Sequence, residues 1–155
     1  MPSLEKIRAI FDLISTGQTQ AFFENIDENV DWTVKGKSEV FHYLSDERAF
    51  CICTHECTSL STSHQRTGTY CPISGHYKSK QAFHEGTRAL SSTWATPLCL
   101  VVQDIIHDGA NKAAVELKAV GVECKDGLKF TNEYIRVCHF NDQDKIVKIN
   151  AFMDT

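Results

Sequence analysis

The chain lacks the long apolar runs and the basic excess that mark two broad classes of protein. A membrane-spanning helix needs about 20 consecutive apolar residues, and the 155 residues contain no such run. The N-terminal segment Met1–Lys6 is polar and has no apolar signal core. Sixteen lysines and arginines stand against 20 aspartates and glutamates, for a net charge of −4, whereas nucleic-acid-binding proteins usually carry a basic face. We therefore expect a soluble, cytoplasmic protein that binds neither membranes nor nucleic acid.

Several catalytic signatures are absent as well. The sequence has no phosphate-binding Walker loop, no dinucleotide-binding fingerprint, no G-x-S-x-G nucleophile motif and no H-E-x-x-H zinc motif. It also has no internal repeat. We accordingly expect a single domain that needs no cofactor.

The seven cysteines do not predict a disulfide framework, because their number is odd and no secretory signal precedes them. Cys51, Cys53, His55 and Cys57 carry atoms that bind zinc, but the Cys-x-Cys spacing is tighter than usual and no second well-spaced pair follows. We interpret this cluster as fortuitous and expect no metal. The cysteines in apolar, strand-like runs are expected to be free core thiols: Cys99, Cys124 and Cys138.

The N-terminal part predicts two helices and a strand. Ser3 is suited to capping a helix, the apolar residues after it recur at helical spacing, and Gly17 suits the helix end. Thr19 can open a second, short helix that reaches Ile26. Residues 29–34 then alternate apolar and polar side chains, as a strand does.

A third helix is predicted after Ser79, which can cap it. Gly86 weakens this helix by about 1 kcal/mol relative to alanine. The helical pattern ends before Pro97.

The C-terminal half predicts four strands joined by tight turns. Asp108-Gly109 and Asp126-Gly127 lie between alternating apolar runs, which is a strong hairpin signal. Four strands in this order form an antiparallel meander, and the helices before them give an α+β class. The predicted strands span residues 98–106, 112–123, 130–140 and 145–153.

Residues 38–70 fit none of these patterns, because they are rich in serine and threonine and their apolar residues have no lasting period. A loop of this length is uncommon inside a compact domain. Two explanations stay open. The segment is a genuine insertion that forms a lid or a partner surface, or it is translated intron sequence; transcript sequencing distinguishes the two.

Four short motifs occur in an informative order: VDWTVKG at 30–36, PISGHYKSKQAF at 72–83, FTNEY at 130–134 and IVKINAFMD at 146–154. They resemble four motifs of the SnoaL-like branch of the nuclear-transport-factor-2-like superfamily. In the same order, these are the VxWxxxG strand, the PxxGxYxGxxxF loop and helix start, the FxNEY motif of small fungal members, and the closing strand. The resemblance covers residues 1–37 and 71–155. It implies a single SnoaL-like domain over residues 1–155, with an atypical insertion at about 38–70.

This resemblance implies a cone-shaped fold in which N-terminal helices pack inside a curved antiparallel sheet and a cavity opens at the wide end. It also implies homodimers that associate through the outer face of the sheet. Relatives include polyketide cyclases, ketosteroid isomerase, dehydratases and non-catalytic binding modules, so the fold alone does not specify the reaction.

The catalytic candidates are Asp154, Tyr134 and Arg136. The resemblance places Asp154 in the pocket as a general acid or base; the alternative is a solvated aspartate near the chain end. Tyr134, Arg136 and Cys138 share one face of a strand because side chains alternate. Tyr134 can donate a hydrogen bond to a carbonyl or enolate, and Arg136 can hold a carboxylate. Cys138 lies where the cyclase branch has a catalytic histidine, which argues against a cyclase-type aldol mechanism.

Two alternatives apply to this strand. In the first alternative neither residue is catalytic: Tyr134 is a packed tyrosine with its hydroxyl at the rim, and Arg136 lies on a dimer surface. If a bulge shifts the parity, Glu133 and His139 point inward instead.

The remaining candidates are substrate-binding residues. By resemblance Trp32 lines the core or the pocket, and His76 flanks the cavity as a proton donor, although a solvated loop histidine is the favoured alternative. Asn150 and Phe152 share a face with Asp154, so Phe152 is expected in the cavity wall and Asn150 either orients a ligand or is a satisfied sheet residue. The set comprises Trp32, His76, Phe83, Cys138, Asn150 and Phe152.

The leading functional hypothesis is a cofactor-independent acid–base cyclase, isomerase or dehydratase of fungal-type secondary metabolism. Its substrate would be a hydrophobic, oxygenated small molecule, such as a polyketide or terpenoid intermediate. The alternative is a non-catalytic ligand-binding or dimerisation module of the same fold; a third, a zinc-dependent interaction domain, depends on the cysteine cluster alone. A buried titratable group facing an apolar cavity favours the enzyme, whereas a cavity filled by aromatic side chains favours the module.

Overall fold

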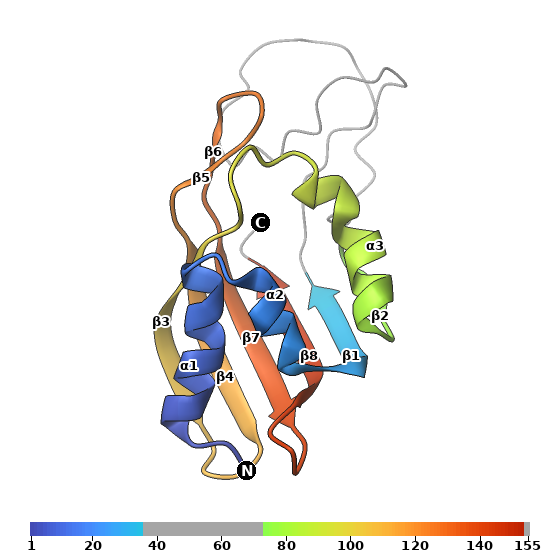
Figure 1. Cartoon of the computed structure of the whole chain (residues 1–155), viewed down its shortest axis with the longest axis vertical. Helices are drawn as coiled ribbons and strands as arrows, with labels where there is room; N and C mark the ends of the chain where they lie inside the picture. Colours follow the sequence, from blue (N-terminus) through green and yellow to red (C-terminus); the bar gives the residue numbers. More distant parts are fainter. Residues whose placement is uncertain (36–72, 154–155) are drawn as a thin grey trace, which may run out of the picture.

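Helices pack against one face of a six-stranded curved sheet in the computed structural model, which describes residues 1–35 and 73–153 (Figure 1). The predicted insertion at 38–70 and the zinc-type cluster at 51–57 lie outside the described residues. The helices are α1 (Leu4–Ser15), α2 (Thr19–Glu24) and α3 (Lys80–Ser91). The strands are β1 (Ile26–Lys35), β2 (Gly75–Tyr77), β3 (Leu100–His107), β4 (Lys112–Ala119), β5 (Val122–Glu123), β6 (Lys129–Phe130), β7 (Glu133–Phe140) and β8 (Ile146–Met153).

The helix caps predicted at Ser3 and Ser79 are confirmed, whereas the second helix ends at Glu24 and not at the predicted Ile26, which starts β1. The Ser3 hydroxyl accepts a hydrogen bond from the Lys6 N–H at 3.2 Å, and the Ser79 hydroxyl accepts one from the Ala82 N–H at 3.1 Å. Each bond satisfies a backbone donor that the first helical turn leaves free. After α1 the chain turns at Gly17, whose φ of 76° is accessible to glycine without strain. The apolar stripe of α1 is buried as its spacing predicts, except for Leu4 in the first turn, which is exposed; the buried residues are Ile7, Ile10, Phe11 and Ile14.

The strand order in the large sheet is β2-β1-β8-β7-β4-β3. The antiparallel meander is confirmed, because β3, β4, β7 and β8 are neighbours in sequence order and all three of their pairs are antiparallel. The prediction of a purely antiparallel sheet is wrong, because β1 pairs with β8 in parallel. These strands are far apart in the chain, so no tight turn forces them to run in opposite directions. The sheet is therefore mixed.

Two of the predicted long strands are each broken in two. The run predicted over 112–123 is interrupted at Gly121, whose φ is 68°, and continues as β5. The run predicted over 130–140 starts as β6 and resumes as β7. β5 and β6 form a small separate hairpin that extends beyond the end of the large sheet (Figure 1).

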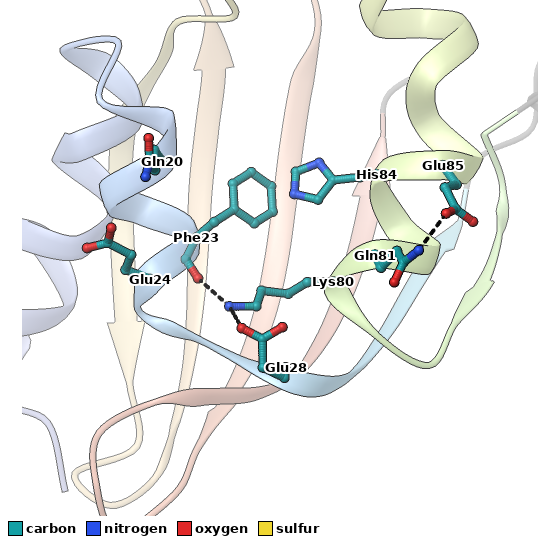
Figure 2. A pocket seen from close by; sticks show the side chains of 8 residues that line it. All are labelled: Gln20, Phe23, Glu24, Glu28, Lys80, Gln81, His84 and Glu85. Atoms are coloured by element: carbon teal, nitrogen blue, oxygen red, sulfur yellow. Dashed lines mark hydrogen bonds and ion pairs between the residues drawn. The ribbon is translucent and has the colours of Figure 1, made fainter.

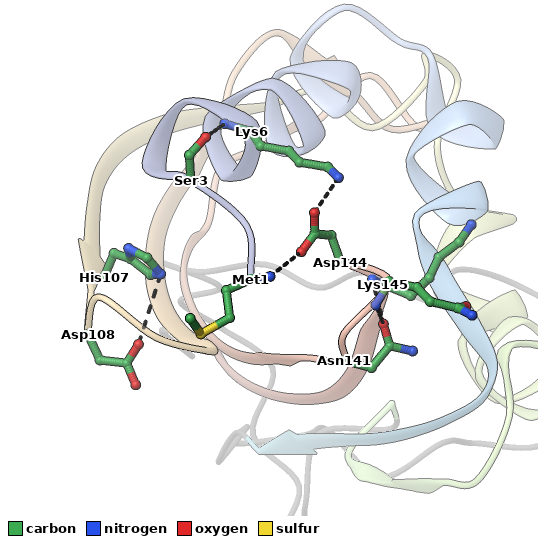
Figure 3. Close-up of polar contacts among 9 residues, drawn as sticks. Met1, Ser3, Lys6, His107, Asp108, Asn141, Asp144 and Lys145 are labelled. Carbon is green, nitrogen blue, oxygen red and sulfur yellow. Dashed lines mark hydrogen bonds and ion pairs between the residues drawn. The ribbon is translucent and has the colours of Figure 1, made fainter.

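The turn between β7 and β8 contacts the N-terminus and the start of α1 (Figure 3). Asp144 has a positive φ of 59°. Its carboxylate forms ion pairs with the Met1 amine at 3.0 Å and with the Lys6 ammonium at 2.6 Å. The hydrogen bond from Lys6 lowers the pKa of Asp144. Asn141 Oδ1 accepts the Lys145 N–H at 2.9 Å. These contacts attach the start of α1 to the sheet.

Side chains on the sheet alternate between a covered inner face and an outer face. On β4 the covered residues are Ala113, Val115, Leu117 and Ala119, and on β1 they include Trp32 and Val34. Helix α1 packs over β3, and α3 packs over β1 and β2. In the described parts of the chain, no helix combines the length and the apolar character needed to cross a bilayer.

Candidate functional site

Three neighbouring side chains of β7 point into the core between the sheet and the helices. Tyr134, Arg136 and Cys138 are 6%, 8% and 0% exposed, so the predicted parity is confirmed. The bulge alternative is wrong for Glu133, which is exposed and bonds Lys118 at 2.9 Å on the outer face. The small irregularity in the β7–β8 pairing lies beyond this trio, between His139 and Phe140.

Arg136 is the one buried charged side chain among the described residues. Its guanidinium carbon lies 5.6 Å from the centroid of the Trp32 ring and 5.8 Å from that of Phe22. Within the described residues, its Nε and Nη1 atoms are buried and have no hydrogen-bond partner. Burial lowers the pKa of Arg136, while the nearby Cys138 and Tyr134 act in the opposite direction. A buried guanidinium that is left without an anion is costly, so this arrangement favours a partner that bears negative charge.

Cys138 next to it is a protonated thiol. Complete burial raises the pKa of Cys138 to about 12, and Arg136 offsets only part of that shift. The thiolate is the nucleophilic form of cysteine. Cys138 therefore acts as a small apolar wall residue at neutral pH, not as a nucleophile.

An aromatic cluster from four elements adjoins Arg136. The rings of Trp32 and Phe83 are stacked, with centroids 3.7 Å apart and planes 12° from parallel. Phe23 of α2 lies 6.1 Å from Trp32, and Tyr77 of β2 meets Phe83 edge-on at 5.6 Å. The indole Nε1 of Trp32 is buried and has no hydrogen-bond partner in the described residues. Trp32 and Phe83 thus form an aromatic wall that leaves a hydrogen-bond donor unused.

The predicted inward positions of Asn150 and Phe152 are wrong. Residues directly opposite each other in a sheet point to the same face. Ile149 and Ala151 lie opposite Cys138 and Arg136, so these two residues of β8 face inward. Phe152 is consequently on the outer face, where it is 42% exposed and its ring lies 5.3 Å from Lys35 Nζ. Asn150, opposite Val137, is half-buried on that same outer face.

His76 also lies on the outer face, and its predicted place beside the cavity is wrong. It is in β2 opposite Thr33, and its Nε2 bonds Asp31 Oδ1. Asp31 is further contacted by Lys78 at 3.4 Å and by Lys148 at 3.7 Å. The hydrogen bond from His76 is the main reason why the pKa of Asp31 is lowered. His76 therefore helps to attach β2 to β1. Asp154, the remaining catalytic candidate, lies outside the described residues.

A surface groove of about 430 Å³ lies between α2 and α3 (Figure 2). Its charged residues are partly paired, because Lys80 Nζ contacts Glu28 at 2.6 Å and donates to the Phe23 carbonyl at 3.2 Å. The rings of Phe23 and His84 are 4.3 Å apart. Sequence reasoning missed the groove, because polar residues of two short helices face each other only after folding. It is lined by Gln20, Phe23, Glu24, Glu28, Lys80, Gln81, His84 and Glu85.

Metal-binding geometry is not found in the part of the chain that the structure describes: no three His, Cys, Asp or Glu side chains there are grouped as metal ligands. The described site therefore consists of one cation, hydrogen-bond donors and apolar walls. Such a set can hold an anionic or carbonyl oxygen of a hydrophobic ligand.

No protein-family model matches the chain, and no curated protein matches it. Several solved structures, however, are similar to it in fold. An NTF2-like protein from Burkholderia thailandensis superposes with a TM-score of 0.62 at 16% identity, covering 99% of this chain and 92% of that one. A candidate isomerase from Rhodopseudomonas palustris gives 0.59 at 15% identity, covering 100% and 93%. TerC co-crystallised with polyporic acid gives 0.60 at 13% identity, covering 99% and 92%. The chain therefore has the nuclear-transport-factor-2-like α+β cone fold.

Proposed function

We propose that the protein is a cofactor-independent acid–base enzyme of the isomerase, cyclase or dehydratase type. Its substrate is a hydrophobic, oxygenated small molecule of polyketide or terpenoid character, produced in secondary metabolism. The observation that carries this proposal is the buried guanidinium of Arg136, whose Nε and Nη1 have no hydrogen-bond partner among the described residues, next to Tyr134 and the Trp32–Phe83 wall. A cation that apolar walls shield from water stabilises negative charge on a substrate oxygen far better than the same cation does in water.

The proposed roles follow from the side-chain chemistry. We assign the removal and return of a proton to Asp154, which follows the last described residue of β8, so the outward direction of Phe152 does not determine where Asp154 points. Tyr134 or Arg136 stabilises the oxygen on which negative charge develops. Trp32 and Phe83 hold the flat, apolar part of the substrate, and Cys138 contributes volume as a neutral thiol. Similar folds support this class of function, since one belongs to a candidate isomerase and another holds polyporic acid.

Proton transfer can be tested without the natural substrate. The enzyme would speed the exchange of the α-protons of an enolisable ketone, such as 2-tetralone, for deuterium in heavy water, which NMR follows. We expect Asp154→Asn to slow the exchange by about 10²- to 10⁴-fold and Tyr134→Phe by about 10²-fold. Glu133→Gln, which changes the adjacent outer-facing residue, is the matched control and should leave the rate unchanged. Full activity in both site variants would refute the catalytic assignment.

A second candidate function is a non-catalytic ligand-binding module. The close Trp32–Phe83 stack favours it, because these rings occupy space between α3 and the sheet that a substrate would otherwise use. Metabolites that co-purify with the protein, identified by mass spectrometry, distinguish the two functions. A module returns them unchanged after incubation, whereas an enzyme converts them.

A further inference from the structure

We propose that Arg136 and the indole N–H of Trp32 form a binding site for the carboxylate of a monoanionic hydrophobic acid. This inference rests on the proposed function, because it names the substrate class of the same site. It differs in one respect: Arg136 binds a charge that the ligand carries permanently, not only a charge that develops during the reaction.

The first argument is an imbalance of charge. Among the described residues, Arg136 is the one buried charge, and no described carboxylate pairs with its guanidinium. Contacts with the rings of Trp32 and Phe22 offset part of the cost of burial. They do not satisfy the N–H groups, which need acceptor atoms. An incoming anion supplies both the missing charge and the missing acceptors.

The second argument is the kind of donor. Trp32 is 1% exposed. Its indole Nε1–H can only donate a hydrogen bond, and it has no acceptor among the described residues. The guanidinium carbon lies 5.6 Å from the centroid of the Trp32 ring, so the two residues are direct neighbours in the core. The unused N–H donors of Arg136 and Trp32 together match a ligand group that carries several hydrogen-bond acceptors. A carboxylate fits because its two oxygens complement the planar guanidinium fork.

The third argument limits the charge of the ligand. One buried cation balances one negative charge, whereas a phosphate monoester carries up to two at neutral pH. A second, unbalanced charge would be desolvated without compensation. The apolar surroundings formed by Phe22, Phe83 and Cys138 favour a hydrocarbon body. The site thus suits a hydrophobic carboxylic acid rather than a phosphorylated metabolite.

The test uses probes matched in size and shape, an anionic carboxylate against its neutral amide: octanoate with octanamide, and cyclohexylacetate with its amide. Trp94→Phe leaves Trp32 as the single tryptophan, so its fluorescence reports binding at the site and calorimetry gives the affinity. We expect each acid to bind at least about tenfold more tightly than its amide. Arg136→Met should abolish that preference, and Arg136→Lys should keep part of it. Equal affinity for acid and amide in the parent protein would overturn the proposal.

A second readout excludes a purely structural role. Because no carboxylate among the described residues pairs with the buried Arg136, replacing it with the apolar Met should raise the melting temperature of the ligand-free protein. A fall in melting temperature would overturn the proposal, since Arg136 would then stabilise the fold itself. If Arg136→Met does not fold, Arg136→Gln provides the same acid-against-amide comparison.

The outcome is separable from that of the proposed function. Selective binding of acids without any proton exchange would refute the enzyme and leave the carboxylate site standing. Conversely, the protein could exchange protons of neutral ketones at a rate that Arg136→Met does not change, and show no preference for acids over amides. That result would refute the carboxylate site and leave the proposed enzyme standing.

Discussion

The ring of Tyr77 in β2 lies directly against Gly86 in α3, where a Cβ atom would come within 2.9 Å of the ring carbon Cζ. Tyr77 cannot easily move away, because its hydroxyl donates a hydrogen bond to the Ile73 carbonyl at 2.7 Å. A glycine that weakens an isolated helix is therefore what allows α3 to pack closely on the sheet.

We expect Gly86→Ala to destabilise the protein by up to about 2 kcal/mol. Alanine improves helix propensity by about 1 kcal/mol, but overpacking against Tyr77 costs typically 1–3 kcal/mol. Urea denaturation measures the free energy of unfolding. In a Tyr77→Leu background, where the ring is absent, the same substitution should become neutral or stabilising. A stabilising Gly86→Ala in the parent protein would contradict this packing.

Cys138 is expected to resist alkylation in the folded protein at pH 8. Its pKa is raised to about 12 and its side chain is fully buried, so little thiolate forms and no reagent reaches it. Iodoacetamide labelling followed by peptide mass spectrometry should modify Cys138 only after addition of denaturant. Rapid labelling of Cys138 in the native protein would show that this part of the core is open.

Asp31→Asn should lower stability at pH 7 by an amount that disappears in acid. The pKa of Asp31 is lowered in the folded state, chiefly by His76. Its carboxylate therefore stabilises the fold above the unfolded pKa of about 3.8, and this contribution is lost as pH falls through the folded pKa. Melting temperatures of both proteins between pH 2 and 7 measure the difference.

Comparison with the parent protein isolates Asp31 from Asp108 and Asp144, whose pKa values are also lowered. A difference that is constant over the whole pH range would contradict this assignment.

We propose that the outer face of the sheet forms a homodimer interface. Ile106, Ile135 and Phe152 are 69%, 49% and 42% exposed there, and Ile135 pairs with Phe152 across β7 and β8. Ile135→Glu should convert dimers to monomers in light scattering, because a charge buried in an apolar interface is unpaired. Leu128→Glu is the matched control: Leu128 is 45% exposed but lies in the β5–β6 turn. A monomeric parent protein would refute the interface.

What the sequence determined by itself was local. Serine caps, apolar periodicity and Asp-Gly turns act between residues a few positions apart, so they predicted the three helices, the meander and the common face of Tyr134, Arg136 and Cys138, but not that this face is the inner one. For β8, where both faces carry apolar residues, the sequence did not determine the inner face, and the predicted inward direction of Asn150 and Phe152 was wrong.

Tertiary structure decided the rest. The pairing of β8 with β7 turned Ile149 and Ala151 inward and Phe152 outward, and the parallel pairing with β1 made the sheet mixed. Packing of the helices against this sheet enclosed Arg136 beside Trp32 with no described anion. These outcomes depend on contacts between residues far apart in the chain, whose geometry and desolvation exist only after the elements have packed together.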